Sequence, residues 1–143
     1  MNIADDELLK LDNEVGFALY ACSKGLIQKY NPILEQQGLT YTSYLAMLVL
    51  WEQDKICVSD LGKRLYLDSG TLTPMLKKME KRGLINRERS EEDERVVYIT
   101  LTRKGAALKE KANALVATLK NTLDMLENNS LFKDLKNLLT KLY

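Results

Sequence analysis

The stretch that decides the fold runs from Ser59 to Thr102 and reads SDLGKRLYLDSGTLTPMLKKMEKRGLINRERSEEDERVVYITLT. Its pattern predicts a short helix from Ser59, a turn over 67–70, a second helix rich in lysine, and a β-hairpin with a charged tip. This order of parts is that of a winged helix-turn-helix, whose second helix enters the major groove of DNA.

Capping chemistry predicts where the two helices start. Ser59 is a suitable N-cap, because its hydroxyl can accept a free backbone N–H of the first turn. In the second helix, Pro74 cannot donate a backbone hydrogen bond and crowds the turn before it. We therefore expect Ser69 or Gly70, rather than Asp68, to cap the second helix.

The second helix is amphipathic. Four apolar residues share one face and should be buried; they are Leu72, Met75, Leu76 and Met79. Hydroxyl and basic residues lie on the other face and its flanks, namely Thr71, Thr73, Lys77, Lys78 and Lys81. Gly83 is expected just after the helix end, because glycine tolerates the left-handed conformation required there.

The hairpin should have a charged, solvated tip. Leu84–Arg89 and Arg95–Leu101 are predicted strands, and the loop between them contains SEEDE. Three arginines, Arg87, Arg89 and Arg95, flank this loop. They suit a wing that lies over a phosphate backbone or in a minor groove. Taken alone, a basic helix face or a charged hairpin is usually solvated surface, so the prediction of DNA binding rests on the ordered combination.

Charge is uneven along the chain, although its 143 residues carry a net charge of only +1. Residues 62–104 hold eleven Lys and Arg against seven Asp and Glu, whereas residues 1–61 hold four against nine. The basic surplus therefore lies in the predicted winged helix. Because phosphate contacts supply most nonspecific DNA affinity, this local surplus matters more than the net charge.

Composition argues against several other classes of protein. The chain has no histidine, the commonest general base and metal ligand at neutral pH. Cys22 and Cys57 lack CxxC spacing and are expected to be reduced thiols. No phosphate loop, dinucleotide glycine pattern or nucleophile elbow is present. We therefore expect no enzymatic activity, no cofactor and no metal. Without a signal sequence or a membrane-length apolar run, we expect a cytoplasmic protein.

Helices are predicted on both sides of the winged helix. Apolar residues recur at three- and four-residue intervals over 6–30, which we expect to form one helix that ends before Pro32. Thr42–Gln53 is a strongly apolar helix and the expected hub of the core. After Thr102, a suitable cap, a similar stripe continues to Leu126.

A last helix is expected after the break at Asn128-Asn129-Ser130, with Ser130 as its cap. The terminal stripes exceed what one small core can cover, although they could fold back on their own domain. We therefore expect a single chain over 1–143 that is mainly α with a small β-hairpin wing. In it, 6–30 and 103–143 are dimerisation helices and 40–102 is the winged helix-turn-helix. A two-fold homodimer would match a palindromic operator in double-stranded DNA.

The sequence resembles the MarR family of bacterial transcription regulators. The resemblance is carried by LDSGTLTPMLKKMEKRGLI and RSEEDERVVYITLT. Within the family, LYLDSGTLTPMLK and RSEEDER are most similar to the organic-hydroperoxide regulators (OhrR) and their one-cysteine relatives. Further similarity through FALYACS, YNPIL and LTYTSYLAMLVLWE extends it from Leu11 to about Lys111. It implies a repressor of the oxidative stress response that binds a pseudo-palindromic operator.

The resemblance also implies which residues meet DNA. On the second helix of the motif these are Ser69, Thr71, Thr73, Lys77, Lys78 and Arg82. On the wing they are Arg87, Arg89, Asp93 and Arg95, with Asp93 holding Arg95 toward the minor groove through a charge-assisted hydrogen bond. Simple turn formation is the other role open to Asp93.

The sensor is where the sequence departs from its relatives. Peroxide-sensing members carry a reactive cysteine in a motif of the form CFALY, hydrogen-bonded to tyrosines. Here the motif begins with Gly16, whereas Tyr20, Tyr30 and Tyr41 stand at the matching positions. Gly16, Tyr20 and Tyr30 share one helical stripe, so a tyrosine pocket is expected around an absent thiol.

Three hypotheses for the function follow. In the first, a small-molecule inducer enters the tyrosine pocket. In the second, oxidation of Cys22 or Cys57 changes the spacing of the recognition helices. Cys22 lies on a different stripe from Gly16, and a small buried apolar role is the simpler interpretation for it. In the third, a thiol-dependent peroxidase uses Cys22, which has no base or cation near it in sequence to activate it.

Overall fold

The computed structural model describes residues 3–127 and 130–143. These residues are mostly helical, with one small antiparallel sheet, which confirms the predicted fold class. The chain divides into two compact units, Met1–Leu45 and Ala46–Tyr143, and the boundary falls within α3 (Tyr41–Glu52). Among the described helices, none is both long enough and apolar enough to cross a bilayer.

The first unit departs from the single helix predicted over 6–30. It contains α1 (Ile3–Leu8), a 3-10 turn (Leu11–Asn13) and α2 (Val15–Glu35). The helix breaks where the Asn13 side chain donates to the Glu7 carbonyl at 2.8 Å, since such bonds compete with the helix backbone.

The predicted end of the helix before Pro32 is also wrong. Pro32 lies inside α2, which continues to Glu35. An interior proline removes one backbone hydrogen bond, here to the Gln28 carbonyl. Leu34, on the next turn, is buried to 2% exposure, and its burial offsets that loss.

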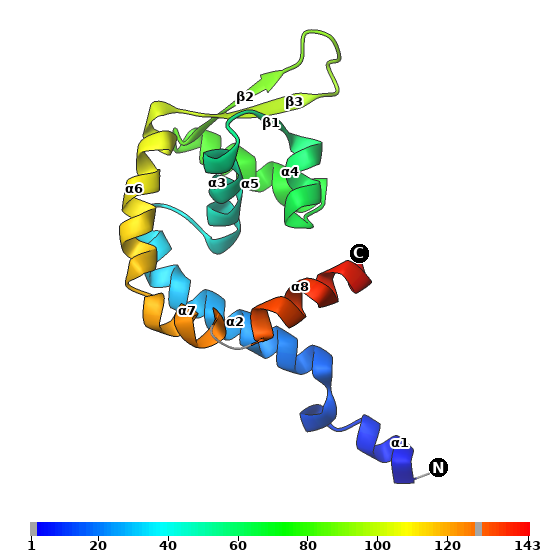
Figure 1. Cartoon of the computed structure of the whole chain (residues 1–143). Coiled ribbons are helices and arrows are strands. Elements are labelled where there is room, and N and C mark those ends of the chain that lie inside the picture. The colour runs from blue at the N-terminus through cyan, green and yellow to red at the C-terminus, as the bar shows by residue number, and fades with distance from the viewer. Residues whose placement is uncertain (1–2, 128–129) are drawn as a thin grey trace. The chain divides into compact units, whose positions relative to one another are not determined.

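The second unit holds the winged helix. After α3 come β1 (Ile56–Cys57), α4 (Val58–Leu65), α5 (Ser69–Lys81), β2 (Ile85–Arg89) and β3 (Val97–Leu101). The sheet is antiparallel in the order β1-β3-β2. Figure 1 shows the β2–β3 hairpin projecting beyond α4 and α5, as expected of a wing. The core of this unit is formed by fully buried residues from each layer: Met47, Leu50, Leu61, Leu72, Leu76, Ile85 and Ile99.

Two predicted caps of the motif are wrong. The N-cap of α4 is Cys57 rather than Ser59, although Cys57 makes no side-chain capping bond. The N-cap of α5 is Asp68, whose carboxylate accepts from the Thr71 N–H at 2.8 Å. Pro74 does not decide between the candidates, because its missing bond is the one to Gly70 whichever of them is the cap. The bond made by Asp68 therefore sets the start, at a typical gain of about 1 kcal/mol.

The end of α5 is as predicted. Gly83 follows the helix with a φ of +75°. Its N–H donates to the Glu80 carbonyl at 2.9 Å, and the Leu84 N–H donates to the Met79 carbonyl at 3.1 Å. This pair of bonds is a Schellman motif, which turns the chain from the recognition helix into the hairpin.

The C-terminal region contains α6 (Arg103–Ala117), α7 (Lys120–Glu127) and α8 (Leu131–Leu142). Thr102 caps α6 as predicted, accepting from the Gly105 N–H at 3.0 Å. The stripe predicted to continue to Leu126 is interrupted after Ala117. There the Thr118 hydroxyl donates to the Leu115 carbonyl at 2.6 Å. Asn128 and Asn129 lie outside the described residues, and the Ser130 side chain makes no capping bond.

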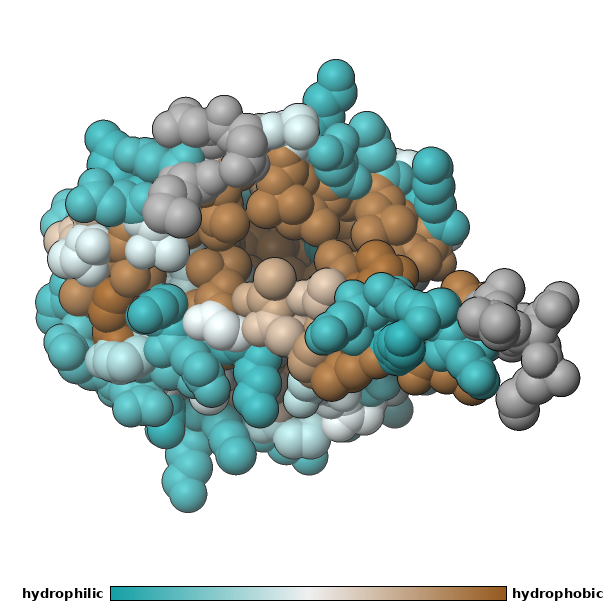
Figure 2. Space-filling view, turned by 90° about the horizontal axis from the view of Figure 1, so that it is seen from below, coloured by the Kyte–Doolittle hydropathy of each residue, from teal (hydrophilic) through white to brown (hydrophobic). Residues whose placement is uncertain are grey.

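Apolar side chains remain exposed in both units. In the first unit they include Leu8, Leu9, Leu11, Val15, Phe17, Leu19 and Tyr20. In the second they include a row along α8, at Leu131, Phe132, Leu135, Leu139 and Leu142. Figure 2 shows apolar side chains, in brown, at the surface of the molecule.

Candidate nucleic-acid interface

The turn between α4 and α5 depends on Gly62. A Cβ at this position would lie 2.8 Å from the Leu67 carbonyl oxygen, a distance that real Cβ atoms essentially never show. The Leu67 N–H in turn donates to the Gly62 carbonyl at 3.0 Å. Between them, Tyr66 adopts the left-handed conformation at a φ of +55°. These contacts bend the chain so that α5 follows α4 within three residues.

The outward face of α5 carries the predicted DNA-binding residues of this helix. Thr71, Lys77 and Lys78 are exposed, and Thr73 is half-buried. Leu72, Leu76 and Met79 are buried as predicted, with Met75 half-buried. Among residues 3–127 and 130–143, neither Lys77 nor Lys78 forms an ion pair. Their charges are therefore available to an anionic partner.

The wing holds Arg95 in one orientation. The Arg95 side chain is 90% exposed, yet its Nε and Nη2 donate to the two Asp93 carboxylate oxygens at 3.1 and 3.2 Å. The Arg95 backbone N–H also donates to Asp93, at 3.0 Å. These bonds from Arg95, the side-chain ones foremost, lower the pKa of Asp93 below its ordinary value. At the end of β2, Arg89 Nη1 donates to the carbonyl of Glu94 in the hairpin loop at 2.9 Å.

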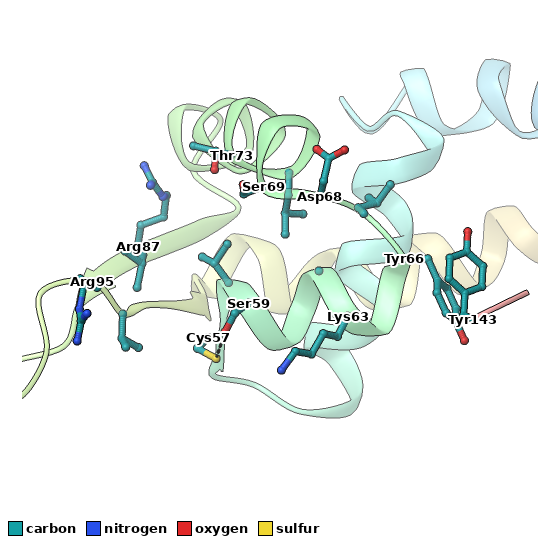
Figure 3. A pocket seen from close by; sticks show the side chains of 16 residues that line it. Cys57, Ser59, Lys63, Tyr66, Asp68, Ser69, Thr73, Arg87, Arg95 and Tyr143 are labelled. Atoms are coloured by element: carbon teal, nitrogen blue, oxygen red, sulfur yellow. Dashed lines mark hydrogen bonds between the residues drawn. The ribbon is translucent and has the colours of Figure 1, made fainter. Parts of the chain in front are cut away.

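A groove of about 740 Å³ lies between α4, the start of α5 and the hairpin. Figure 3 shows Arg87 and Arg95 on its hairpin side, Ser69 and Thr73 on α5, and Ser59 and Lys63 on α4. The structure thus brings four predicted DNA-binding residues to one place: Ser69, Thr73, Arg87 and Arg95. Sequence reasoning missed Ser59 and Lys63 as partners of this site, because a three-dimensional turn, not spacing along the chain, places α4 beside the wing.

The structure brings only some of the predicted sensor residues together within one chain. Gly16 is exposed in the first turn of α2, where its N–H donates to Glu14 Oε1 at 2.8 Å. Tyr30 lies fourteen residues further along the same helix, roughly 21 Å away at 1.5 Å per residue. Tyr20, 62% exposed, lines a shallow depression of α2 that includes neither Gly16 nor Tyr30.

Tyr30 and Tyr41 do form one cluster, together with Tyr44. The ring centroids of Tyr30 and Tyr41 are 5.1 Å apart in an edge-to-face arrangement, and Tyr44 lies 5.9 Å from Tyr30. Burial raises the pKa of Tyr41, and burial followed by the charge of Tyr41 raises the pKa of Tyr44. Both phenols are therefore neutral hydrogen-bond donors at physiological pH. Tyr44 was missed by the sequence analysis, although it follows Tyr41 at a helical spacing of three.

Both cysteines are free thiols. Cys22 is exposed in the single chain, which overturns the interpretation of a small buried apolar side chain. Cys57 is half-buried, and its thiol donates to Asp60 Oδ2 at 3.0 Å. Within the described part of the chain, no group of three or more His, Cys, Asp or Glu residues could hold a metal ion.

Comparison with known proteins agrees with this architecture. Residues 28–112 match the family described as transcriptional regulator SarA/Rot. The chain is 50% identical, over 135 residues, to an organic hydroperoxide resistance transcriptional regulator of Bacillus subtilis, covering 94% of this chain and 88% of that protein. It is 40% identical to the HTH-type transcriptional regulator SarZ of Staphylococcus haemolyticus, with 91% and 90% covered.

A solved structure is similar over nearly the whole chain. Reduced AbfR of Staphylococcus epidermidis, bound to DNA, superposes with a TM-score of 0.79 at 36% identity. The match covers 95% of this chain and 97% of AbfR. Sequence, fold and the basic helix beside an arginine-bearing wing agree, and the chain belongs to the MarR family of transcriptional regulators, alongside the organic hydroperoxide resistance regulators.

Proposed function

We propose that this regulator binds an operator in double-stranded DNA through α5 and the β2–β3 hairpin. The observation that carries the proposal is the outward face of α5 beside a wing that holds Arg95 extended. On that face, Lys77 and Lys78 form no ion pair with any residue that the structure describes. The α5 residues assigned to base or phosphate contacts are Ser69, Thr71, Thr73, Lys77, Lys78 and Arg82. The wing contributes Arg87, Arg89 and Arg95, with Asp93 as the residue that orients Arg95. The DNA-bound state of AbfR supports this assignment.

A Lys77→Ala variant should test the role of α5. Its exposed ammonium is assigned to a phosphate, so the variant should bind all sequences about tenfold more weakly and lose about one unit of salt slope. The measurement is a salt titration of binding to a duplex that the wild-type protein selects from a random library. Glu110→Ala, an exposed change on α6, is the control and should bind as wild type does. Wild-type affinity in the Lys77 variant would contradict the placement of α5.

An Arg95→Ala variant should weaken operator binding and flatten its salt dependence, because it removes a cation from the minor groove. Asp93→Asn keeps the arginine but weakens the hydrogen bonds between Asp93 and Arg95, so a smaller loss of affinity is expected. Since the pKa of Asp93 is lowered, its carboxylate is ionised at and above its ordinary pKa. These hydrogen bonds weaken only as the pH falls through the lowered value. The effect of Arg95→Ala should therefore be constant between about pH 5 and pH 8. Equal binding by all three proteins would exclude this role for the wing.

We further propose that the regulator acts as a homodimer, with the exposed apolar residues of each unit at the interface between the two copies. A soluble monomer rarely exposes many large apolar side chains together. Here they are exposed both in the N-terminal segment and along α8. A two-fold dimer would present two α5 helices to successive major grooves. The dimer also offers the only way in which Gly16 and Tyr30 can share a pocket, because within one helix they are roughly 21 Å apart.

Replacement of Leu139 by Glu should test the interface. This residue is 39% exposed within the apolar stripe of α8, and a buried carboxylate there would be strongly unfavourable. We expect a shift to monomer in sedimentation and a loss of operator affinity of at least tenfold. Asn137→Glu adds the same charge on the opposite side of α8 and should leave the dimer intact. A Leu139→Glu protein that remains fully dimeric would show that this face of α8 is not part of the dimer interface.

For the signal, the proposal is release from the operator by a small molecule that binds at the tyrosine cluster. The neutral phenols of Tyr41 and Tyr44 can donate to a polar or anionic group there. The alternative, an oxidant that acts through Cys22 or Cys57, is placed second. The Cys57 thiol donates a hydrogen bond to the Asp60 carboxylate, and a negative neighbour does not favour the thiolate that would react. As a regulator of transcription rather than an enzyme, the protein would work in the cytoplasm, where its DNA lies.

A further inference from the structure

Tyr66 occupies an unusual backbone position in the helix-turn-helix. It lies in the turn between α4 and α5, at a φ of +55° and a ψ of +38°. This left-handed region favours glycine, asparagine and aspartate, because a larger side chain crowds the backbone there. A tyrosine at this position costs conformational free energy, and such a residue persists where contacts around it offset the cost.

Neither the core nor the backbone of the turn accounts for a tyrosine here. The residue is 50% exposed, so its ring is not a core side chain. The bonds that close the turn run from the Tyr66 and Leu67 N–H groups to the Lys63 and Gly62 carbonyls. They involve only backbone atoms and are open to any residue that has an N–H. A role specific to tyrosine at position 66 therefore lies in its exposed ring.

The ring of Tyr66 packs against the ring of Tyr143. Their centroids are 4.3 Å apart, and the ring planes are tilted by 38°. Figure 3 shows the two side chains beside each other at the end of α4. Aromatic pairs at such short separations contribute free energy beyond the area that they bury. The contact therefore helps to offset the backbone cost of Tyr66.

Tyr143 brings this contact from α8. Tyr143 directly follows that helix, and its N–H donates to the Leu139 carbonyl at 3.2 Å, which holds it on the last turn. Leu139, four residues earlier, lies on the same stripe of the helix. It is 39% exposed and belongs to the apolar row that we assign to the dimer interface. A movement of this stripe against a second copy would therefore also move the Tyr143 ring.

We infer that the contact between Tyr66 and Tyr143 couples the dimer interface to the recognition helix, with Tyr143 as a positioning residue. The inference rests on the proposed function, namely operator binding through α5 by a dimer that uses α8. Because α5 begins at Ser69, three residues after Tyr66, a shift of the turn passes directly to the start of α5. The contact thus holds each recognition helix at the separation that successive major grooves require.

The effect on DNA binding follows from populations. Without the ring contact, fewer dimers hold both α5 helices in the binding geometry, and the apparent affinity falls in proportion to that fraction. Neither tyrosine carries a positive charge, so the number of phosphates neutralised stays the same. The salt dependence of binding should therefore not change. This combination separates a positioning residue from one that contacts phosphate.

The test is a double-mutant cycle with Tyr66→Asn, Tyr143→Ala and the double variant, on a duplex that the wild-type protein selects from a random library. Asparagine tolerates the left-handed conformation, so Tyr66→Asn removes the ring without adding backbone strain. Each single variant should bind about three- to tenfold more weakly than wild type, the range expected for one aromatic pair. The double variant should bind no more weakly than the single variants, because all three lack the same contact.

Two variants are controls. Tyr143→Phe keeps the ring and should bind as wild type does. Asn137→Ala, at an exposed position of α8, should do the same. Sedimentation at the concentration of the binding assay should show every variant as the dimer.

Hydrogen exchange gives a readout that needs no DNA. The Leu67 and Thr71 amides donate to the Gly62 carbonyl and the Asp68 carboxylate, so they report the opening of the turn. Both should exchange about three- to tenfold faster in Tyr143→Ala and at the wild-type rate in Tyr143→Phe.

The outcomes separate the inference from the proposal on which it rests. Wild-type affinity in Tyr143→Ala, or losses that add in the double variant, would overturn the coupling while operator binding by α5 stands. A monomeric Tyr143→Ala protein, or unchanged exchange at Leu67 and Thr71, would overturn it too. If the wild-type protein selects no duplex even at low salt, the proposed function itself fails, and the coupling to DNA fails with it.

Discussion

Replacement of Gly105 by Ala is expected to be the most destabilising single-methyl change in this chain. A Cβ at Gly105 would lie 2.0 Å from the Leu84 carbonyl oxygen and 3.1 Å from its carbon. These are backbone atoms, so no side-chain rotation can relieve the overlap. Leu84 cannot simply retreat, because its carbonyl also accepts from the Thr102 N–H at 3.1 Å.

The same glycine connects three elements of the second unit. Its N–H caps α6 on Thr102, and its carbonyl accepts from the Trp51 indole of α3 at 3.0 Å. Moving α6 away to admit a methyl group would therefore also weaken the contact of α6 with α3. Overpacking typically costs 1–3 kcal/mol and occasionally more; with a backbone clash we expect about 3 kcal/mol or more. That is a large fraction of a typical folding free energy.

The measurement is thermal unfolding followed by circular dichroism at one fixed protomer concentration, because a dimer's midpoint depends on concentration. We expect Gly105→Ala to lower Tm by roughly 10 °C, at about 3–4 °C per kcal/mol for a chain of this size. Gly25→Ala is the matched control. Apart from its own helix backbone and chain neighbours, no described atom lies within 4 Å of a Cβ at this position, and alanine in a helix is favoured by up to about 1 kcal/mol. A Tm for Gly105→Ala within 2 °C of wild type would show that the approach to Leu84 is looser than described.

Gly105 also illustrates what the sequence could and could not predict. The inward face of α5 and the strands of the hairpin follow from period and composition, so they were predicted close to their observed bounds. The need for glycine at 62 and 105 arises from carbonyls that only the fold brings near. No local pattern around either residue carries that information.

The predicted cap of α5 and the predicted end of the first long helix were wrong because Pro74 and Pro32 were given too much weight. Each proline costs a single backbone hydrogen bond, which packing or a cap can offset. The tyrosine pocket stays a prediction. Residues on one helical stripe need not share one site within a chain, and Gly16 and Tyr30 lie on the same stripe but about four turns apart, so a pocket that holds both requires a second copy.

A Gly16→Cys variant should convert the protein into a hydroperoxide-responsive regulator. The position can accept a side chain, since the tightest contact of a Cβ there would be Glu14 Oε1, at 2.9 Å, the far end of a flexible side chain. A thiol in the first turn of α2 lies at the positive end of the helix dipole, which favours the reactive thiolate. The thiolate would attack the peroxide O–O bond, giving a sulfenate and releasing the alcohol.

Glu14 opposes this chemistry. Its carboxylate accepts from the Gly16 N–H as the N-cap of α2, and its negative charge disfavours a nearby thiolate. Glu14→Ser keeps a capping side chain and removes the charge. The double variant, Glu14→Ser with Gly16→Cys, should therefore react faster with hydroperoxide than Gly16→Cys alone.

Operator binding before and after treatment with cumene hydroperoxide provides the measurement, in a background that carries Cys22→Ser and Cys57→Ser. The Gly16→Cys protein should lose at least tenfold in affinity and gain one oxygen in its mass, and the background protein should retain its affinity. The wild-type protein, which carries both native cysteines, should likewise retain its affinity for the operator after this treatment. If wild type loses binding instead, and Cys22→Ser or Cys57→Ser alone abolishes that loss, then a native thiol is the sensor and the tyrosine cluster is not where the signal enters.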